Sequence, residues 1–259
     1  MNKNFLLLKN LIFFNLKEKY FGSYFGILWL FISPMIMMFL FTFIFLFVFQ
    51  TRLPGFEFDK FSFTIWLLSG YVPWLFISES ISNSANSLST NAVLLKNLNI
   101  KISLVPLASV ISSIVPLFIG LIIILTLIFF STLTISYQVF FFIPIYITIG
   151  TILFTGIGYY LSFLNTFIND ISIALPQILL IILFASPIFY PIDVYPETVR
   201  GILKYNPIYI YCEFFRDLLI YKKSVNLLKI CFFSLFSFSI FISGSIIINR
   251  YKTILLSRL

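Results

Sequence analysis

Residues 102–169 read ISLVPLASVISSIVPLFIGLIIILTLIFFSTLTISYQVFFFIPIYITIGTILFTGIGYYLSFLNTFIN and contain no Asp, Glu, Lys or Arg. The hydrocarbon core of a bilayer is about 30 Å thick, so one helical crossing needs about 20 apolar residues. At about 1.5 Å per residue, a single helix of this block would be several bilayers long. The block must therefore fold back on itself, and we expect its turn in the polar residues 131–138. Two membrane crossings are predicted here.

The other uncharged blocks are each about one crossing long, and they cover residues 20–51, 61–78, 171–192 and 230–249. The chain is therefore predicted to be an all-α integral membrane protein with six transmembrane helices. The predicted spans are 24–49, 61–78, 104–130, 139–163, 171–189 and 230–248.

Composition supports a membrane protein and excludes several function classes. Hydrophobic residues make up 60% of the chain and charged residues 10%, far from the balance of soluble proteins. The net charge of +8 comes from basic residues scattered at segment ends, so we expect membrane lipids and no nucleic acid as partners. The chain has no histidine, and Cys212 and Cys231 lack metal-ligand spacing. We therefore predict no metal site, no catalytic residues and no enzyme.

Basic residues also predict the orientation of the chain. The two termini and the segment with Lys96 and Lys101 are basic and face the same side in a six-span arrangement, so both termini are expected in the cytoplasm. The N-terminal segment has no small-residue cleavage site after a short apolar run, which argues against a signal peptide. Apolar residues recur there at helical spacing, which indicates an amphipathic interface helix over residues 1–22; an ordinary basic anchor is the alternative. These residues are Phe5, Leu8, Ile12 and Leu16.

Two connections are long enough to carry structure of their own. Residues 83–101 are predicted to continue the second helix and then form a short cytoplasmic coupling segment. Residues 190–229 follow the proline-rich stretch SPIFYP (186–191) and contain two amphipathic patterns, which predicts short re-entrant helices acting as an outer gate. In the first pattern Val199, Ile202 and Leu203 oppose Glu197, Arg200 and Lys204; in the second Phe214, Phe215, Leu218 and Leu219 oppose Glu213, Arg216 and Asp217.

The sequence offers no energy source for uphill transport. It contains no G-x-x-x-x-G-K-[ST] phosphate loop. No carboxylate lies deep in a span except Glu79, at the end of the second, and its role is left open between a polar cap and a helix contact. The missing intramembrane ionisable residues argue against an ion-driven carrier and against an embedded hydrolase. If the chain moves something uphill, the energy must come from a partner.

Three blocks resemble, in order, the transmembrane subunits of ABC-2-type exporters, and most of all the branch that exports lipopolysaccharide O-antigen, capsular polysaccharide or teichoic acid. The first is YFGSYFGILW (20–29) with Ser33–Pro34. The second is LSGYVPW (68–74) with Glu79–Ser80. The third is SPIFYP (186–191), followed by Tyr195–Pro196, Arg200, Asn206–Pro207 and Arg216–Asp217.

The resemblance implies a permease that forms a single domain over residues 1–259 in the bacterial cytoplasmic (inner) membrane. It implies a homodimer that pairs with two copies of a separate ATP-binding subunit, which uses ATP and Mg while this chain binds no cofactor. The implied substrate is a lipid-linked glycan, typically on undecaprenyl diphosphate, moved outward.

Three sets of residues are expected to serve this activity. Docking on the ATPase is expected of Lys17, Glu18, Lys19, Tyr20, Leu94, Leu95 and Lys96, with simple topology anchoring as the alternative for the lysines. Aromatic rings can stack on sugars, so a substrate path is expected at Trp29, Trp74, Tyr159, Tyr160 and Tyr190; membrane-interface anchoring is the alternative. Contact with departing diphosphate or acidic sugars is expected of Arg200, Lys204 and Arg216, with ion pairs to Glu197, Glu213 and Asp217 as the simpler explanation.

Other functions remain open at this stage. An ABC-2 exporter of drugs or small lipids shares the six-span plan. A membrane-bound glycan-modifying enzyme would need catalytic clusters that the sequence does not show. A regulated channel fits the span count but would not need docking elements.

Overall fold

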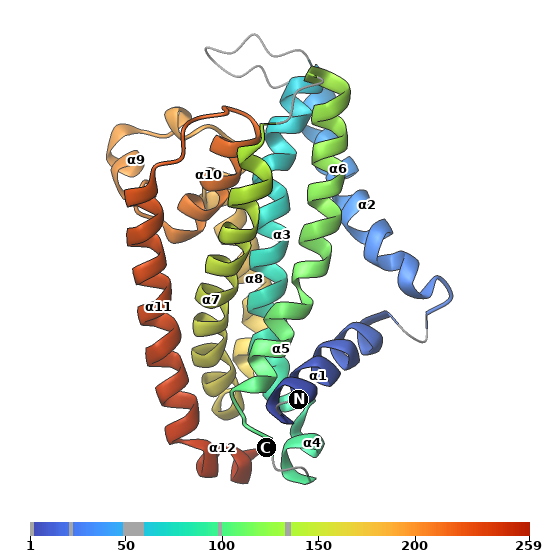
Figure 1. Cartoon of the computed structure of the whole chain (residues 1–259), viewed down its shortest axis with the longest axis vertical. Coiled ribbons are helices and arrows are strands. Elements are labelled where there is room, and N and C mark those ends of the chain that lie inside the picture. Colours follow the sequence, from blue (N-terminus) through green and yellow to red (C-terminus); the bar gives the residue numbers. More distant parts are fainter. Residues whose placement is uncertain (1–2, 21–22, 49–59, 98–99, 133–135) are drawn as a thin grey trace.

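The computed structural model describes residues 3–20, 23–48, 60–97, 100–132 and 136–259, and over these residues it is a bundle of helices without a strand (Figure 1). The all-helical prediction is confirmed. The helices are α1 (Lys3–Tyr20), α2 (Trp29–Phe43), α3 (Lys60–Thr90), α4 (Ala92–Asn97), α5 (Leu104–Ser112), α6 (Ile114–Thr132), α7 (Gln138–Phe167), α8 (Asp170–Ala185), α9 (Glu197–Leu203), α10 (Pro207–Leu219), α11 (Leu227–Arg250) and α12 (Lys252–Arg258). Shorter 3-10 or π turns are η1 (Gly26–Leu28), η2 (Ile44–Val48) and η3 (Ile192–Val194).

The helix α3 lies at the centre of the bundle and packs against α5, α6, α7, α8 and α10. Figure 1 shows α11 along the flank of α7, and α2 leaning away from the bundle at its Trp29 end. The helices α1, α4 and α12 lie at one end, together with the C-terminus, and we call it the terminal end. The helices α9 and α10 lie at the opposite end, which we call the gate end.

The core is built around the apolar half of α3. Leu67, Val72 and Ile77 of this helix are fully buried although they point in different directions around its axis. A helix that is apolar on all sides is stable only when neighbours cover it on all sides. Five helices do so here, which explains the central position of α3.

A helix, α1, lies where the interface helix is predicted, and its buried face differs from the expected one; its place at a membrane interface stays a prediction. Leu11 is buried, and Leu8 and Ile12 pack against the same cluster, which also contains Leu255 of α12. Phe5, which was expected on the apolar face, is 58% exposed. Helical spacing alone allows two overlapping apolar stripes, and packing against α5 selects the one that contains Leu11. The ends of the predicted range, 1–2 and 21–22, lie outside the described residues.

Among the described residues, four segments are long and apolar enough to cross a membrane: Trp29–Val48, Leu104–Ser131, Gln138–Phe167 and Leu227–Arg250. The helix α8 is apolar but shorter. The helix α3 contains the predicted second span and then continues through a polar stretch to Thr90, as expected, before α4 begins. These helices identify a multi-pass membrane protein, and the total of six spans stays a prediction.

Two predicted spans have different boundaries from those expected. The predicted span 104–130 is divided into α5 and α6 at Ser113, whose amide bonds to the carbonyls of both Ser109 and Val110. The predicted span 171–189 stops as a helix at Ala185, because Pro187 restricts the preceding residue to extended backbone and Ser186 is extended. The predicted fold-back of the block 102–169 is confirmed, since α6 ends at Thr132 and α7 begins at Gln138. Residues 133–135 of the predicted turn lie outside the described residues.

The close approach of α7 and α11 depends on Gly156. A methyl group added to Gly156 would lie 2.7 Å from the backbone nitrogen of Phe241 and 2.8 Å from the carbonyl carbon of Ile240. Both contacts are with backbone, which cannot swing aside as a side chain can. The two helices must therefore separate if residue 156 carries a side chain.

We expect Gly156→Ala to destabilise the folded chain by about 1–3 kcal/mol, because overpacking forces a shift of backbone. Gly201→Ala is the matched control, since nothing lies within 4 Å of the added methyl group and the substitution favours helix. Thermal unfolding of both variants in the same detergent measures the difference. An unfolding midpoint for Gly156→Ala at or above that of Gly201→Ala would contradict the packing argument.

Candidate functional site

The most unusual local structure is the buried turn formed by residues 186–190, between α8 and η3. Pro187 is buried, and Ile188 and Phe189 are fully buried, although the chain has left the helix at this point. Backbone carbonyls outside a helix need other partners when no water reaches them. The partners of this turn come from α10.

Arg216 of α10 supplies those partners. It is 4% exposed, its Nη1 donates to the carbonyl oxygen of Pro187 at 2.7 Å, and its Nη2 donates to the carbonyl oxygen of Ile188. The guanidinium lies over the ring of Trp66 of α3, with its carbon 4.0 Å from the ring centroid. Gly70 makes room for this arrangement, because a side chain there would overlap the guanidinium. Arg216 was expected on the polar face of α10, and the structure buries it instead.

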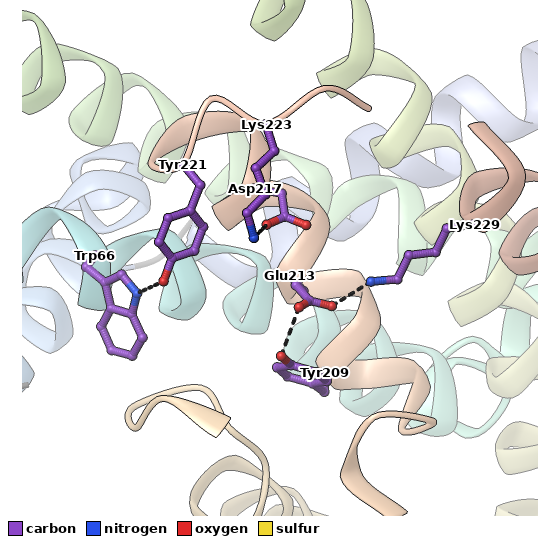
Figure 2. A network of polar contacts seen from close by, with 7 residues as sticks. All are labelled: Trp66, Tyr209, Glu213, Asp217, Tyr221, Lys223 and Lys229. Carbon is purple, nitrogen blue, oxygen red and sulfur yellow. Dashed lines mark hydrogen bonds and ion pairs between the residues drawn. The ribbon is translucent and has the colours of Figure 1, made fainter. Parts of the chain in front are cut away.

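The acidic residues of α10 are paired with lysines from the following segment (Figure 2). Glu213 accepts from the hydroxyl of Tyr209 at 2.9 Å and from Nζ of Lys229 at 2.7 Å, which connects α10 to α11. Asp217 pairs with Lys223 at 3.1 Å, and this hydrogen bond raises the pKa of Lys223. The expected pairing of these acids within their own helix is therefore wrong. The loop after α10 folds back and presents its lysines to the carboxylates.

The helix α9 also differs from its predicted pattern. Arg200 pairs with Asp193 of η3 at 3.5 Å rather than with Glu197, and its Nη2 donates to the carbonyl oxygens of Asp193 and Tyr195. Ile202, expected on a buried face, is 76% exposed. A helix of seven residues without a covering neighbour cannot bury its apolar side. Lys204, which directly follows α9, is exposed.

The five aromatic residues expected along a substrate path are not gathered in one place. Trp74 and Tyr159 are buried within the chain, whereas Trp29, Tyr160 and Tyr190 are partly exposed. Their role in a path stays a prediction. Sequence reasoning placed Tyr190 in the path but missed the aromatic group to which it belongs, in which rings of α2, η2 and α3 surround the turn 186–190 with centroids 4.5–6.1 Å apart. Its members are Phe41, Phe45, Tyr71, Phe189 and Tyr190. Phe41 and Phe45 are four residues apart, and this helical spacing is the feature of the sequence that could have indicated a shared aromatic face.

The expected docking residues lie at the terminal end. Lys17 and Glu18 of α1 and Lys96 of α4 are exposed. Leu95 is 4% exposed and belongs to the cluster that holds α4 against the bundle, and Leu94 packs against that cluster. Leu95 therefore anchors α4 and presents no free surface. The side chains of Lys19 and Tyr20 lie outside the described part of the structure.

The long apolar helices and the buried polar turn are those of a multi-pass membrane protein. The chain belongs to the ABC-2 type transporter family, whose sequence profile matches residues 7–220. It is 28% identical over 195 residues to an O-antigen export system permease protein RfbA of Klebsiella pneumoniae, covering 75% of this chain and 72% of the relative. A second such protein of that species is 27% identical, covering 79% and 76%. The RfbA permease of Myxococcus xanthus is 26% identical, covering 78% and 75%.

Arg216→Met is expected to lower the free energy of unfolding by about 3 kcal/mol, because two buried carbonyls lose their donors. Arg216→Lys should recover only part of this loss, since one ammonium group cannot match the fork of a guanidinium. Arg200→Met is the control and should lose about 1 kcal/mol or less, because its ion pair and the two carbonyl oxygens to which it donates are at least partly solvated. Chemical unfolding in mixed micelles measures all three. Equal losses for Arg216→Met and Arg200→Met would contradict the assigned role.

A double-mutant cycle with Glu213→Gln and Lys229→Met should show a coupling of about 1 kcal/mol, because the pair is partly buried and joins two helices. The pair of Asp217 and Lys223 serves as the comparison and should show a smaller coupling, since Lys223 is more exposed. The same unfolding assay applies. A coupling for the first pair no larger than for the second would show that Glu213 does not fasten α10 to α11.

Proposed function

We propose that this chain is the membrane-spanning subunit of an ATP-driven exporter of a lipid-linked polysaccharide, of the O-antigen, capsule or teichoic acid type. The observation that carries the proposal is the family match over residues 7–220 together with relatives that are named O-antigen export permeases over about three quarters of this chain. Two chains would form the membrane part, and two ATP-binding subunits would bind ATP and Mg and hydrolyse the nucleotide.

Six spans are proposed, with α3 as the second and α8 as the fifth. The length of α3 supports the first of these assignments, because its apolar half is as long as a bilayer crossing before the polar stretch begins. The amphipathic helix α10 before α11 supports a re-entrant element at the gate end, since its apolar face is buried and its acidic residues pair with lysines of the following segment. The gate end would face outward and both termini would lie in the cytoplasm.

Docking of the ATP-binding subunit is proposed at α1 and α4. Both helices lie at the terminal end, and both are held by one apolar cluster that also includes residues of α5 and α12 (Figure 1). A displacement of α4 by the ATP-binding subunit would therefore move the bundle, because Leu95 and its neighbours pack α4 against it.

Purification of a tagged chain from its native membrane, followed by mass spectrometry, tests the proposal. We expect a stoichiometric ATP-binding subunit whose ATP hydrolysis rises with a lipid-linked glycan. Hydrolysis that instead rises only with drugs or small lipids would favour that other class of exporter. Absence of the subunit under conditions that keep other ABC exporters intact would refute the function.

Lys96→Glu is expected to reduce the amount of co-purified ATP-binding subunit several-fold, because Lys96 is exposed on the proposed docking helix. Lys204→Glu is the matched control, with the same change of charge on an exposed residue that directly follows α9 at the gate end. Quantitative mass spectrometry of both preparations gives the ratio of subunits. Equal ratios would argue against docking at α4.

A further inference from the structure

The buried side chain of Asn165 joins three helices at the terminal end. It lies in the last turn of α7 and is 3% exposed. Its Nδ2 donates to the carbonyl oxygen of Ala85 and to Oδ1 of Asn86 in α3, both at 3.2 Å. Its Oδ1 accepts from the backbone amide of Ser172 in α8 at 3.1 Å. One side chain therefore fixes the start of α8 against the polar half of α3.

The opposite end of α8 is fixed at the gate end. The helix has 16 residues, so it is about 24 Å long, and it leads directly into the buried turn 186–190. Arg216 donates to two carbonyl oxygens of this turn and lies over the ring of Trp66 in α3. Asn206 donates to Oγ of Ser186 at 3.0 Å. The end of α8 is thus joined to α3 through α10.

Between these two joints α8 contacts the bundle through apolar side chains. It packs against α3 and α7 and buries one stripe of leucines, Leu175, Leu179 and Leu183. Apolar contact has no preferred direction, and packed helices can slide past one another by small amounts. The hydrogen bonds at the two ends therefore decide whether α8 keeps its position along α3.

Each of the two helices contains one proline. Pro73 in α3 and Pro176 in α8 each remove one hydrogen bond within their own helix, so each helix can bend there. Pro73 lies about 18 Å along α3 from Ala85, whereas Pro176 lies about 6 Å along α8 from Ser172. The two weak points are at different distances from Asn165. Each helix can therefore brace the other at its weak point as long as both ends stay joined.

We propose that α3, α8 and the turn 186–190 form one closed frame, and that Asn165 is the positioning residue that keeps the frame closed at the terminal end. Arg216 closes it at the gate end. A displacement of the polar half of α3 then also displaces the start of α8, and the turn and α10 move with them. Without Asn165, α3 could bend at Pro73 and α8 could slide, so the gate end would follow the terminal end less closely.

The frame continues into the docking helix α4. Asn91 is the single residue between α3 and α4. Its amide bonds to the carbonyl oxygen of Ser87 at 3.2 Å, and its own carbonyl oxygen accepts from the amide of Leu95 at 3.0 Å. This step rests on the proposed function, which places the ATP-binding subunit at α4. A movement of that subunit would reach the gate end through the frame.

Hydrogen–deuterium exchange with mass spectrometry tests the frame on the chain with its ATP-binding subunit in lipid nanodiscs, without nucleotide and after trapping with ATP and vanadate. Asn83→Ala is the matched control for Asn165→Ala, because Asn83 bonds from α3 to Ser113 at 3.1 Å and does not contact α8 through this bond. We expect the nucleotide-dependent change in exchange at residues 186–219 to fall about threefold or more in Asn165→Ala. It should persist in Asn83→Ala, and the change at residues 92–97 should persist in both.

This difference separates a positioning role from a merely structural one. A residue that only stabilises the fold would change exchange in both nucleotide states alike and leave their difference unaltered. Asn165→Ser is the second variant and takes the place of Asn165→Ala should that chain fail to fold. A serine hydroxyl in a helix bonds to its own backbone and would not join α8 to α3.

The frame is overturned if the exchange of residues 186–219 does not respond to nucleotide in the unmodified complex. It is also overturned if the response in Asn165→Ala equals that of the unmodified complex, or if Asn83→Ala loses as much. In each case the proposed function stands. If no ATP-binding subunit accompanies the chain, the function fails and the chain alone decides on the frame. Faster exchange at residues 186–190 in Asn165→Ala than in Asn83→Ala would then support it, and equal exchange would overturn it.

Discussion

A polypeptide that leaves its helix inside apolar surroundings must find partners for its backbone carbonyls, and this requirement shapes the gate end. The turn 186–190 meets it with Arg216, whose two terminal nitrogens reach the carbonyls of Pro187 and Ile188. Lysine could not do so, because its ammonium group lacks the planar fork. The buried guanidinium also needs a favourable contact in place of water, and a cation–π contact with the face of Trp66 provides one.

The position of α10 follows from this contact. Once Arg216 is fixed between the turn and α3, the apolar residues of α10, such as Phe215, lie against α7, and Glu213 is presented to Lys229 of α11. Asn206 adds a second link to the turn, since its Nδ2 donates to Oγ of Ser186 at 3.0 Å. The helix α10 is thus joined to α3, α8 and α11, whereas α9 is exposed. If the gate end moves during transport, α10 and the turn would move as one unit.

Much of the architecture could be predicted from the sequence, because it follows from long-range hydropathy. The charge-free blocks located the long helices, although α8 ends at Ala185, just before Pro187 and before the predicted end of that span at residue 189. Side-chain partners could not be predicted in the same way. The polar face assigned to α10 placed Arg216 beside Glu213 and Asp217, since helical spacing is all that a sequence offers locally. The actual partners come from residues 6–29 positions away, and only the folded chain brings them together. The buried face of α1 was misjudged for a related reason, because α5 selects it.

The polar half of α3 shows why a membrane protein can bury so many hydroxyls near its terminal end. Serine side chains there bond to carbonyls of their own helix, as Ser84 does to Ile81 and Ser87 does to Ser84, so they need no partner elsewhere. The asparagines behave differently and reach across helices, as Asn83 does to Ser113 and Asn165 does to Asn86. The serine hydroxyls bond within their own helix, and the asparagine amides bond between helices. Together they let α3, α5 and α7 pack through polar side chains that carry no charge.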